Sequence, residues 1–247
     1  MKRMDDCFID LTITSPPYDN LREYKGYEFE FQKIANELFR VTKEGGVVIW
    51  IVGDSTIKGS ETGTSFKQAL YFKEIGFNLH DTMIYKKNSP PLTHKRYEQN
   101  FEYMFVLCKG KIKTFNPIYR KKIYKDTRNE TQNRREKNGE FSKGFRSKSK
   151  KTIRGNIWEY SVGGGISSTD KISFLHPAIF PEQLVKEHIY SWSNEEDLVY
   201  DSFMGSGTTA KMAYLQKRKW IGSEISKEYT ELANKRIEKY INQTTLF

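Results

Sequence analysis

An apolar run that ends in two prolines is the feature of this sequence that most constrains its fold. Residues 8–13 are mainly apolar and β-branched, and they lead directly into Thr14-Ser15-Pro16-Pro17-Tyr18. A run of this kind predicts a buried strand. Proline fixes φ and lacks an amide hydrogen, so Pro16-Pro17 cannot continue the ladder of a sheet. Because a residue before a proline avoids the helical region, we expect a stiff, extended tetrapeptide at the carboxyl end of this strand.

The tetrapeptide could present three different groups to one small planar ligand. These are the hydroxyl of Ser15, the carbonyl of Pro16 and the ring of Tyr18. In open α/β sheets, ligands bind just beyond the carboxyl ends of the strands. The same residues fit equally well a Pro-Pro turn with a purely structural role, so only the rest of the chain can decide between the two interpretations.

The rest of the chain alternates between segments with helical periodicity and short apolar runs. This alternation predicts an α/β fold, with a Rossmann-like, mainly parallel sheet and helices on both of its faces. Expected strands cover 47–52, 77–85, 101–107, 198–201 and 219–223, and expected helices cover 32–41, 65–75, the second part of 176–191, the second part of 205–215, and 226–241. Glu44-Gly45-Gly46 is expected to end the first of these helices.

The positive charge is concentrated in one internal segment. The formal net charge of the chain is +10, and residues 109–154 contain 17 Lys or Arg against 4 Asp or Glu, so the remainder is slightly acidic. We therefore predict a basic insert at 109–154 within a domain formed by 1–108 and 155–247. Such a local excess favours a polyanionic partner, nucleic acid first of all. The alternative is a solvated, flexible basic loop.

A glycine-containing loop lies between an expected strand and an expected helix in the second half of the chain. Its sequence is Asp201-Ser202-Phe203-Met204-Gly205-Ser206-Gly207-Thr208. Glycines at such a place let the backbone approach a ligand closely. Roughly 20 residues on, the next expected strand ends at Glu224, a spacing at which a carboxylate can accept the hydroxyls of a ribose. The loop matches neither a P-loop nor a Gly-x-Gly-x-x-Gly fingerprint.

Three motifs together resemble those of a known family. Ser15-Pro16-Pro17-Tyr18 resembles the catalytic signature of DNA methyltransferases that modify exocyclic amino groups, in the serine form most typical of cytosine-N4 enzymes. Phe203-x-Gly205-x-Gly207 resembles the S-adenosylmethionine motif of these enzymes, and 176–181 resembles the segment that covers the methionine end of the cofactor. The order, with the catalytic motif first and the cofactor loop last, is that of the permuted β class.

The resemblance implies a role for each matching residue. Ser15 and the Pro16 carbonyl would accept the two amino hydrogens of the target base, Pro17 would stiffen the tetrapeptide, and Tyr18 would stack on a base flipped out of the duplex. The residues expected at the S-adenosylmethionine site are Ser15, Phe180, Asp201, Phe203, Gly205, Gly207, Thr208 and Glu224. No metal is expected, because no cluster of His, Cys and carboxylates suggests a metal site.

The basic insert is expected to bind double-stranded DNA. Its Lys and Arg residues would mostly contact phosphates, and a few side chains would read base edges in the major groove. The candidates are Lys121, Lys122, Arg128, Arg134, Arg135 and Arg146.

Several alternatives remain open at this point. Adenine-N6 methylation is the nearest, and a non-catalytic DNA-binding protein with an impaired cofactor site belongs to another class. Related Pro-Pro-Tyr enzymes modify RNA bases or glutamine amides. Carbon-5 methylation of cytosine is not expected, because those enzymes use a cysteine nucleophile that follows a proline, and neither Cys7 nor Cys108 does. Relatives usually have a further strand and an acidic residue before the catalytic strand. We therefore expect either an upstream start of translation or an incomplete adenine pocket.

The remaining composition indicates where such a protein works. No apolar run is long enough to cross a bilayer, which takes about 18 residues or more, and the amino terminus lacks a secretory hydrophobic region. The two cysteines form no disulfide framework. We expect a cytoplasmic enzyme of a restriction–modification or phage system, acting as a monomer or homodimer, with a cognate restriction endonuclease as a possible partner.

Overall fold

The computed structural model divides the chain into two compact units. It describes residues 1, 3–17, 29–88, 97–122, 131–145, 149–163, 165–176 and 179–244. The first unit consists of Met1–Asn116 and Asn156–Phe247, and the second of Pro117–Gly155. Lys109, where we expected the basic insert to begin, is the last residue of a strand in the first unit.

The first unit is built around one seven-stranded sheet with the order β11-β5-β6-β2-β1-β12-β13. Strand β6 runs antiparallel to both of its neighbours, and every other neighbouring pair is parallel. This confirms the predicted α/β fold with a mainly parallel sheet. The bounds are β1 Ile9–Thr14, β2 Thr42–Val52, β5 Phe77–Lys87, β6 Phe101–Lys109, β11 Ile157–Tyr160, β12 Leu198–Asp201 and β13 Lys219–Gly222.

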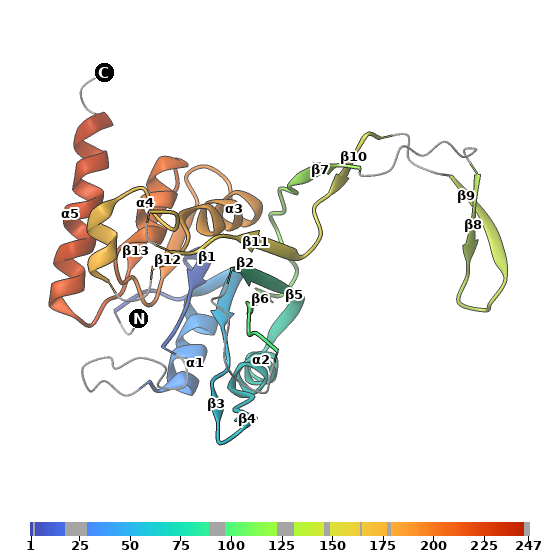
Figure 1. Ribbon diagram of the computed structural model, residues 1–247, viewed down its shortest axis with the longest axis horizontal. Coiled ribbons are helices and arrows are strands. Elements are labelled where there is room, and N and C mark those ends of the chain that lie inside the picture. The colour runs from blue at the N-terminus through green and yellow to red at the C-terminus, as the bar shows by residue number, and fades with distance from the viewer. Residues whose placement is uncertain are drawn as a thin grey trace. The chain divides into compact units, whose positions relative to one another are not determined.

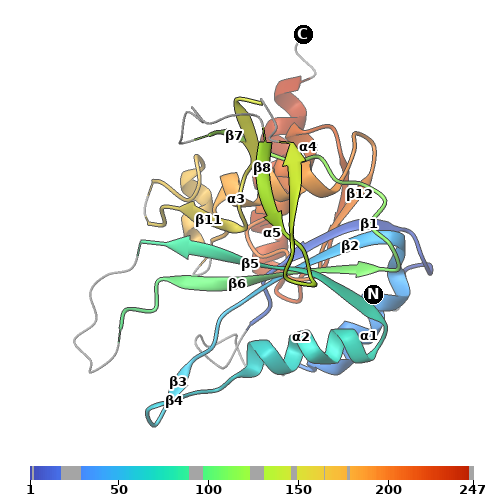
Figure 2. The same cartoon turned by 90° about the vertical axis from the view of Figure 1, so that its right-hand side faces the viewer.

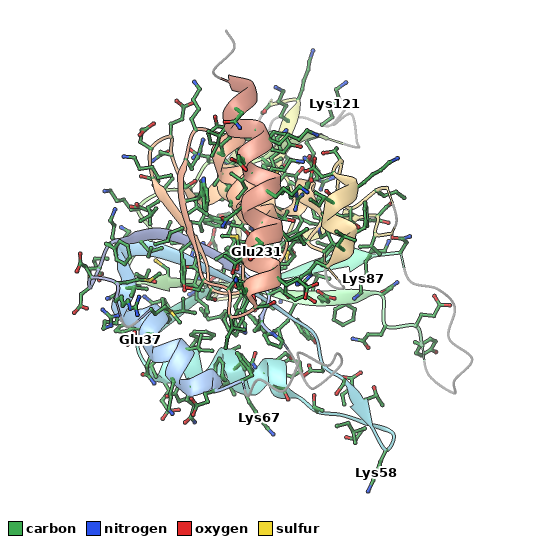
Figure 3. The ribbon with its side chains drawn as sticks, turned by 90° about the vertical axis from the view of Figure 1, so that its left-hand side faces the viewer. Glu37, Lys58, Lys67, Lys87, Lys121 and Glu231 are labelled. Atoms are coloured by element: carbon green, nitrogen blue, oxygen red, sulfur yellow. The ribbon has the colours of Figure 1, made fainter. Side chains whose placement is uncertain are left out.

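Helices cover both faces of this sheet, as Figures 1 and 2 show. Helices α1 (Phe31–Val41) and α2 (Thr64–Glu74) lie on one face, and α3 (Glu182–Trp192), α4 (Thr208–Leu215) and α5 (Lys227–Thr244) lie on the other. A 3₁₀ helix, η1 (Lys171–Leu175), precedes α3, and a short hairpin of β3 (Thr56–Ile57) and β4 (Ser60–Glu61) precedes α2. Lys58 at the hairpin tip and Lys67 on α2 point away from the sheet (Figure 3).

Trp50 organises the core between the sheet and helices α1 and α2. Its indole is fully buried and packs edge-on against Phe72 at 5.1 Å between ring centroids. The N–H of a buried indole usually has a hydrogen-bond partner. The Nε1 of Trp50 donates to Oε1 of Gln68 at 2.8 Å, so a buried side-chain amide of α2 accepts the hydrogen bond of the indole.

Strand β2 differs from its expected form at its amino end. We expected Glu44-Gly45-Gly46 to end the preceding helix, yet α1 ends at Val41 and β2 begins at Thr42. The pairing with β1 moves from Ile9↔Thr42 to Leu11↔Val47, so β2 carries extra residues in a bulge. Gly45 has a φ of 79° there, a conformation that favours glycine. The two glycines therefore shape a bulge within the strand.

The second unit consists of two short antiparallel ribbons. Strand β7 (Tyr119–Lys121) pairs with β10 (Lys151–Ile153), and β8 (Thr131–Arg135) pairs with β9 (Phe141–Phe145). These strands were not among those expected from the sequence, because the apolar residues of this segment are few and not periodic. Backbone pairing does not require an apolar pattern, so the sequence carries no signal of these strands.

No helix in the described part of the chain is long and apolar enough to cross a membrane.

Replacement of Gly46 by alanine tests the bulge. A Cβ at this buried position would lie 2.9 Å from the carbonyl oxygen of Lys43 and 3.1 Å from that of Asp10. Both are backbone atoms, so Gly46→Ala is expected to lower the free energy of unfolding by about 1–3 kcal/mol. Gly155→Ala is the control, because its Cβ would meet no atom within 4 Å. Equal stability of the two variants in urea denaturation would contradict the account of the bulge.

Candidate active site

Three of the predicted site segments follow three neighbouring parallel strands. The register places Leu11 of β1 beside Val199 of β12, and Asp201 of β12 beside Gly222 of β13. The carboxyl ends of the strands therefore meet at one edge of the sheet. Ser15-Pro16-Pro17 follows β1, the glycine loop follows β12, and Glu224 comes two residues after β13. Ligands of such folds bind at this edge.

Asp201 is the junction between the first two of these segments. Its carboxylate is buried, and Oδ1 accepts hydrogen bonds from the Thr14 hydroxyl at 2.8 Å and from the Phe203 amide at 3.0 Å. Oδ2 accepts from the Thr209 hydroxyl at 2.6 Å, and Ser202 donates to Thr14 at 3.1 Å. The residue that precedes Ser15 is thus tied to the start of the glycine loop and to α4. We predicted Asp201 as a cofactor ligand, and its contacts here are with protein donors.

Burial raises the pKa of Asp201 to about 6, because a charged carboxylate is poorly solvated in the interior. The hydrogen bonds from Thr209, Phe203 and Thr14 favour the charged form and limit this rise. The carboxyl group therefore changes its charge in the mildly acidic range, although its hydrogen bonds are the ones that join the two strands.

The glycine loop needs both of its glycines. Gly205 has a φ of 50° and Gly207 a φ of 79°. A Cβ on Gly205 would lie 3.0 Å from the imidazole Nε2 of His176, and a Cβ on Gly207 would lie 3.0 Å from Ala233 on α5. Close packing on the inner side and positive φ together require glycine at these two predicted positions.

Glu224 binds both the glycine loop and the residues that follow it in the chain. Its Oε2 accepts the Gly205 amide at 2.8 Å, and its Oε1 accepts the amides of Ile225 and Ser226, both at 2.9 Å. A carboxylate offers about four acceptor positions, so roughly one is left for a donor on a ligand. The exposed side chain of Ile225 lies next to this carboxylate in the chain and offers an apolar surface that the sequence analysis did not single out.

The segment before α3 lies against the glycine loop. The ring of His176 is buried, and it contacts the Tyr229 ring at 4.4 Å between centroids. Phe180 is half-buried, and Phe203 packs edge-on against Phe29 at 5.6 Å. Residues 177 and 178 lie outside the described residues.

The structure places the remaining predicted residues as follows. Pro16 and Thr208 are buried, and Ser15 and Pro17 are half-buried. Tyr18, Arg128 and Arg146 lie outside the described residues. Lys121 and Lys122 are exposed, Arg135 is exposed, and the backbone of Arg134 pairs with that of Ser142 in the β8–β9 hairpin. Within the described ranges, no three His, Cys, Asp or Glu side chains gather closely enough to hold a metal ion.

The sequence analysis missed the polar groups behind the site. Thr14 and Thr209 bind Asp201, and a buried group of charges, Asp170, Glu182, Lys211 and Arg236, lies on the inner side of the glycine loop. Lys211 lies between Ala210 and Met212 in α4, a helix with no other charged residue, and this placement was the one available signal. The partners come from distant parts of the chain, and the sequence does not show them together.

Comparisons with known proteins agree on one class. The family described as DNA methylase matches residues 9–235. The chain is 57% identical over 245 residues to the orphan methyltransferase M.BamHII of Bacillus amyloliquefaciens, with 97% of this chain and 92% of that protein covered. It is 25% identical to the type II methyltransferase M.BglII of Bacillus subtilis, with 92% of this chain and 63% of that protein covered.

Solved structures show the same fold. The PvuII DNA methyltransferase, described as cytosine-N4-specific, matches with a TM-score of 0.66 and 19% identity, covering 98% of this chain and 87% of that one. The complex of M1.HpyAVI with S-adenosylmethionine matches with a TM-score of 0.60 and 24% identity, covering 93% of this chain and 89% of that one.

The titration of Asp201 gives a testable prediction. A raised pKa means that this group stabilises the folded state most below its unfolded pKa of about 4, and that this contribution is lost as the pH rises through about 6. Asp201→Asn does not titrate. Relative to this variant, the wild type is expected to lose about 2–3 kcal/mol of unfolding free energy between pH 4 and pH 7. If the difference in unfolding free energy between the wild type and Asp201→Asn does not change with pH, the pKa of Asp201 is not raised.

Proposed function

Because the chain belongs to the N6/N4 DNA methylase family, we propose that it transfers a methyl group from S-adenosylmethionine to the N4 amino group of cytosine in duplex DNA. One observation carries the proposal. The Thr14–Asp201 hydrogen bond joins the strand that ends in Ser15-Pro16-Pro17 to the strand that leads into the glycine loop. Groups suited to an amino substrate and groups suited to the cofactor thus follow two bonded strands.

The residues present fit this cofactor. The positive φ values of Gly205 and Gly207 give the loop a backbone course that residues with a Cβ rarely adopt, and Glu224 has an acceptor position left for a ribose hydroxyl. Ser15, Phe180, Phe203 and Thr208 complete the proposed set. When bound, S-adenosylmethionine supplies the electrophilic methyl group, and the chain supplies orientation of both reactants.

Ser15 and Pro16 would activate the target amino group. The lone pair of this nitrogen is delocalised into the base, so the nitrogen is a poor nucleophile. The hydroxyl oxygen of Ser15 and the carbonyl oxygen of Pro16 can accept hydrogen bonds from its two N–H groups. These hydrogen bonds would favour a pyramidal nitrogen with a free lone pair. Fixed dipoles directed at developing charge are often the largest contribution to catalysis. Pro17 keeps the backbone extended, and Tyr18 would stack on the flipped base.

The choice of cytosine depends on Ser15, since the serine form of the motif is most typical of N4 enzymes. Adenine N6 is the second candidate, because the family includes both activities. A non-catalytic DNA-binding protein is the candidate of another class. A cofactor titration by calorimetry separates it, because that protein would not bind S-adenosylmethionine at millimolar concentration.

The basic insert, residues 109–154, would recognise the target DNA. Lys121, Lys122 and Arg135 are exposed there, and we assign phosphate and base-edge contacts to them together with Arg128, Arg134 and Arg146. The relatives are named as orphan or type II methyltransferases, which supports a role in a restriction–modification type of system. A cognate endonuclease would be a partner in that setting, and a monomer or a homodimer would each suit the reaction.

Ser15→Ala tests the proposed chemistry. Loss of one acceptor that acts on the reacting group is expected to lower kcat by about 100-fold or more. The dissociation constant for DNA should change by less than about threefold, because the DNA contacts are assigned to the basic insert and not to Ser15. Ser60→Ala in the exposed strand β4 is the control. Wild-type turnover in the Ser15 variant would contradict the mechanism.

A pair of arginine replacements tests whether the basic insert binds DNA. Arg134→Ala with Arg135→Ala should weaken DNA binding, and it should reduce the slope of log Kd against log salt by up to about 2. Lys217→Ala with Lys219→Ala removes the same charge. These lysines lie at the amino end of β13, opposite the site edge, so this pair should leave the slope unchanged. If the two pairs of replacements change DNA binding and its salt dependence equally, the β8–β9 hairpin is not part of the DNA interface.

A further inference from the structure

Four charged side chains from separate elements meet behind the glycine loop. Asp170 precedes η1, Glu182 begins α3, Lys211 lies in α4 and Arg236 lies in α5. We call them the four-charge cluster. Lys211 and Arg236 are almost completely buried, and Asp170 is nearly so. Burying an ion pair is often no better for stability than an apolar contact of equal volume, so its presence calls for another explanation.

Arg236 uses all of its donor nitrogens. Its Nε donates to Asp170 at 2.9 Å, and one terminal nitrogen donates to Glu182 at 2.6 Å and to the Ser168 hydroxyl at 3.0 Å. The other terminal nitrogen donates to the carbonyl oxygen of Ser206 at 2.9 Å and to the Thr208 hydroxyl at 3.0 Å. The planar guanidinium therefore links two carboxylates to the backbone of the glycine loop, a geometry that lysine cannot reproduce.

Lys211 completes the charge balance of the cluster. Its ammonium group donates to Asp170 and Glu182, both at 2.7 Å, and to the Thr169 hydroxyl at 2.8 Å. Burial alone would raise the pKa of Asp170, but hydrogen bonds from Lys211, Tyr240 and Arg236 outweigh it and hold this pKa at about 2. The cluster is thus fully ionised at neutral pH, with two positive and two negative charges.

The contact with Ser206 gives the cluster a place in the cofactor site. Ser206 lies between Gly205 and Gly207, the two residues with positive φ. The buried Arg236 binds the Ser206 carbonyl, and Glu224 binds the amide of the preceding Gly205. Two neighbouring loop residues are therefore held by charge-assisted hydrogen bonds, which are stronger than neutral ones.

The same cluster holds both ends of the segment that lies against the loop. Asp170 and Glu182 bracket residues 171–181, which include His176, packed against Gly205, and the half-buried Phe180. Arg236 binds the carboxylate at each end. One side chain from the last helix thus sets the position of the loop relative to the segment beside it.

We propose that Arg236 is a positioning residue for the cofactor, which acts through the Ser206 carbonyl and through the ends of the 170–182 segment. This inference rests on the proposed function, since it concerns the same S-adenosylmethionine site. Arg236 is buried behind the loop and contacts protein groups, so it sets the affinity for the cofactor and takes no part in the chemical step.

Arg236→Lys tests the proposal. Lysine retains the positive charge for Asp170 and Glu182 but lacks the second arm that reaches Ser206. The dissociation constant and KM for S-adenosylmethionine are expected to rise at least tenfold, with kcat at saturating cofactor and DNA affinity within threefold of wild type. Gly46→Ala is the control for stability alone, because it destabilises the amino-terminal half of β2, away from the carboxyl ends of the strands where the site lies. It should leave the cofactor affinity unchanged.

The outcomes separate this proposal from the proposed function. Unchanged cofactor affinity in a folded Arg236→Lys variant, or an equal loss in Gly46→Ala, overturns the positioning role alone. Failure of the wild type to bind S-adenosylmethionine in calorimetry overturns both. If Arg236→Lys does not fold, Ser168→Ala takes its place, because it removes one acceptor of the guanidinium away from the loop. It is expected to raise the dissociation constant about threefold, and wild-type affinity would overturn the proposal.

Discussion

The hydrogen bond between Thr14 and Asp201 is the interaction on which the arrangement of the site depends. It joins the last residue of β1 to the last residue of β12, and these two residues are 187 positions apart in sequence. Parallel pairing brings the strand ends to one edge of the sheet, but side-chain contacts must fix the segments beyond them. Asp201 does this by accepting from Thr14, from the Phe203 amide and from Thr209 at the start of α4.

The arrangement uses charged side chains, two of them buried, to hold backbone in place. Asp201, Glu224 and Arg236 each bind backbone groups of the glycine loop or of its flanks. A buried charge is costly unless every donor and acceptor is satisfied, and here the carboxylates and the guanidinium each have several partners. The raised pKa of Asp201 reflects that cost. The two glycines give the loop backbone much conformational freedom, so neighbouring elements provide the order.

The sequence was sufficient to predict the sheet and the segments at its edge. Pro16-Pro17 ended β1 as expected, because proline cannot extend a ladder, and the apolar runs of β12 and β13 located the loop and Glu224. The glycines at 45 and 46 were misread as a helix end, because a bulge and a helix terminus both favour glycine. Thr14, Asp170, Lys211 and Arg236 could not be assigned from sequence, since their roles arise from contacts between distant segments.

The most direct test is mass spectrometry of nucleosides from unmethylated plasmid DNA incubated with the protein and isotopically labelled S-adenosylmethionine. The account predicts label in 4-methylcytosine in the wild type and none above background in Ser15→Ala. Label in 6-methyladenine would contradict the assignment of the base. Absence of label from every nucleoside, with cofactor and DNA both shown to bind, would contradict the proposal that the segments after β1 and β12 form a working active site.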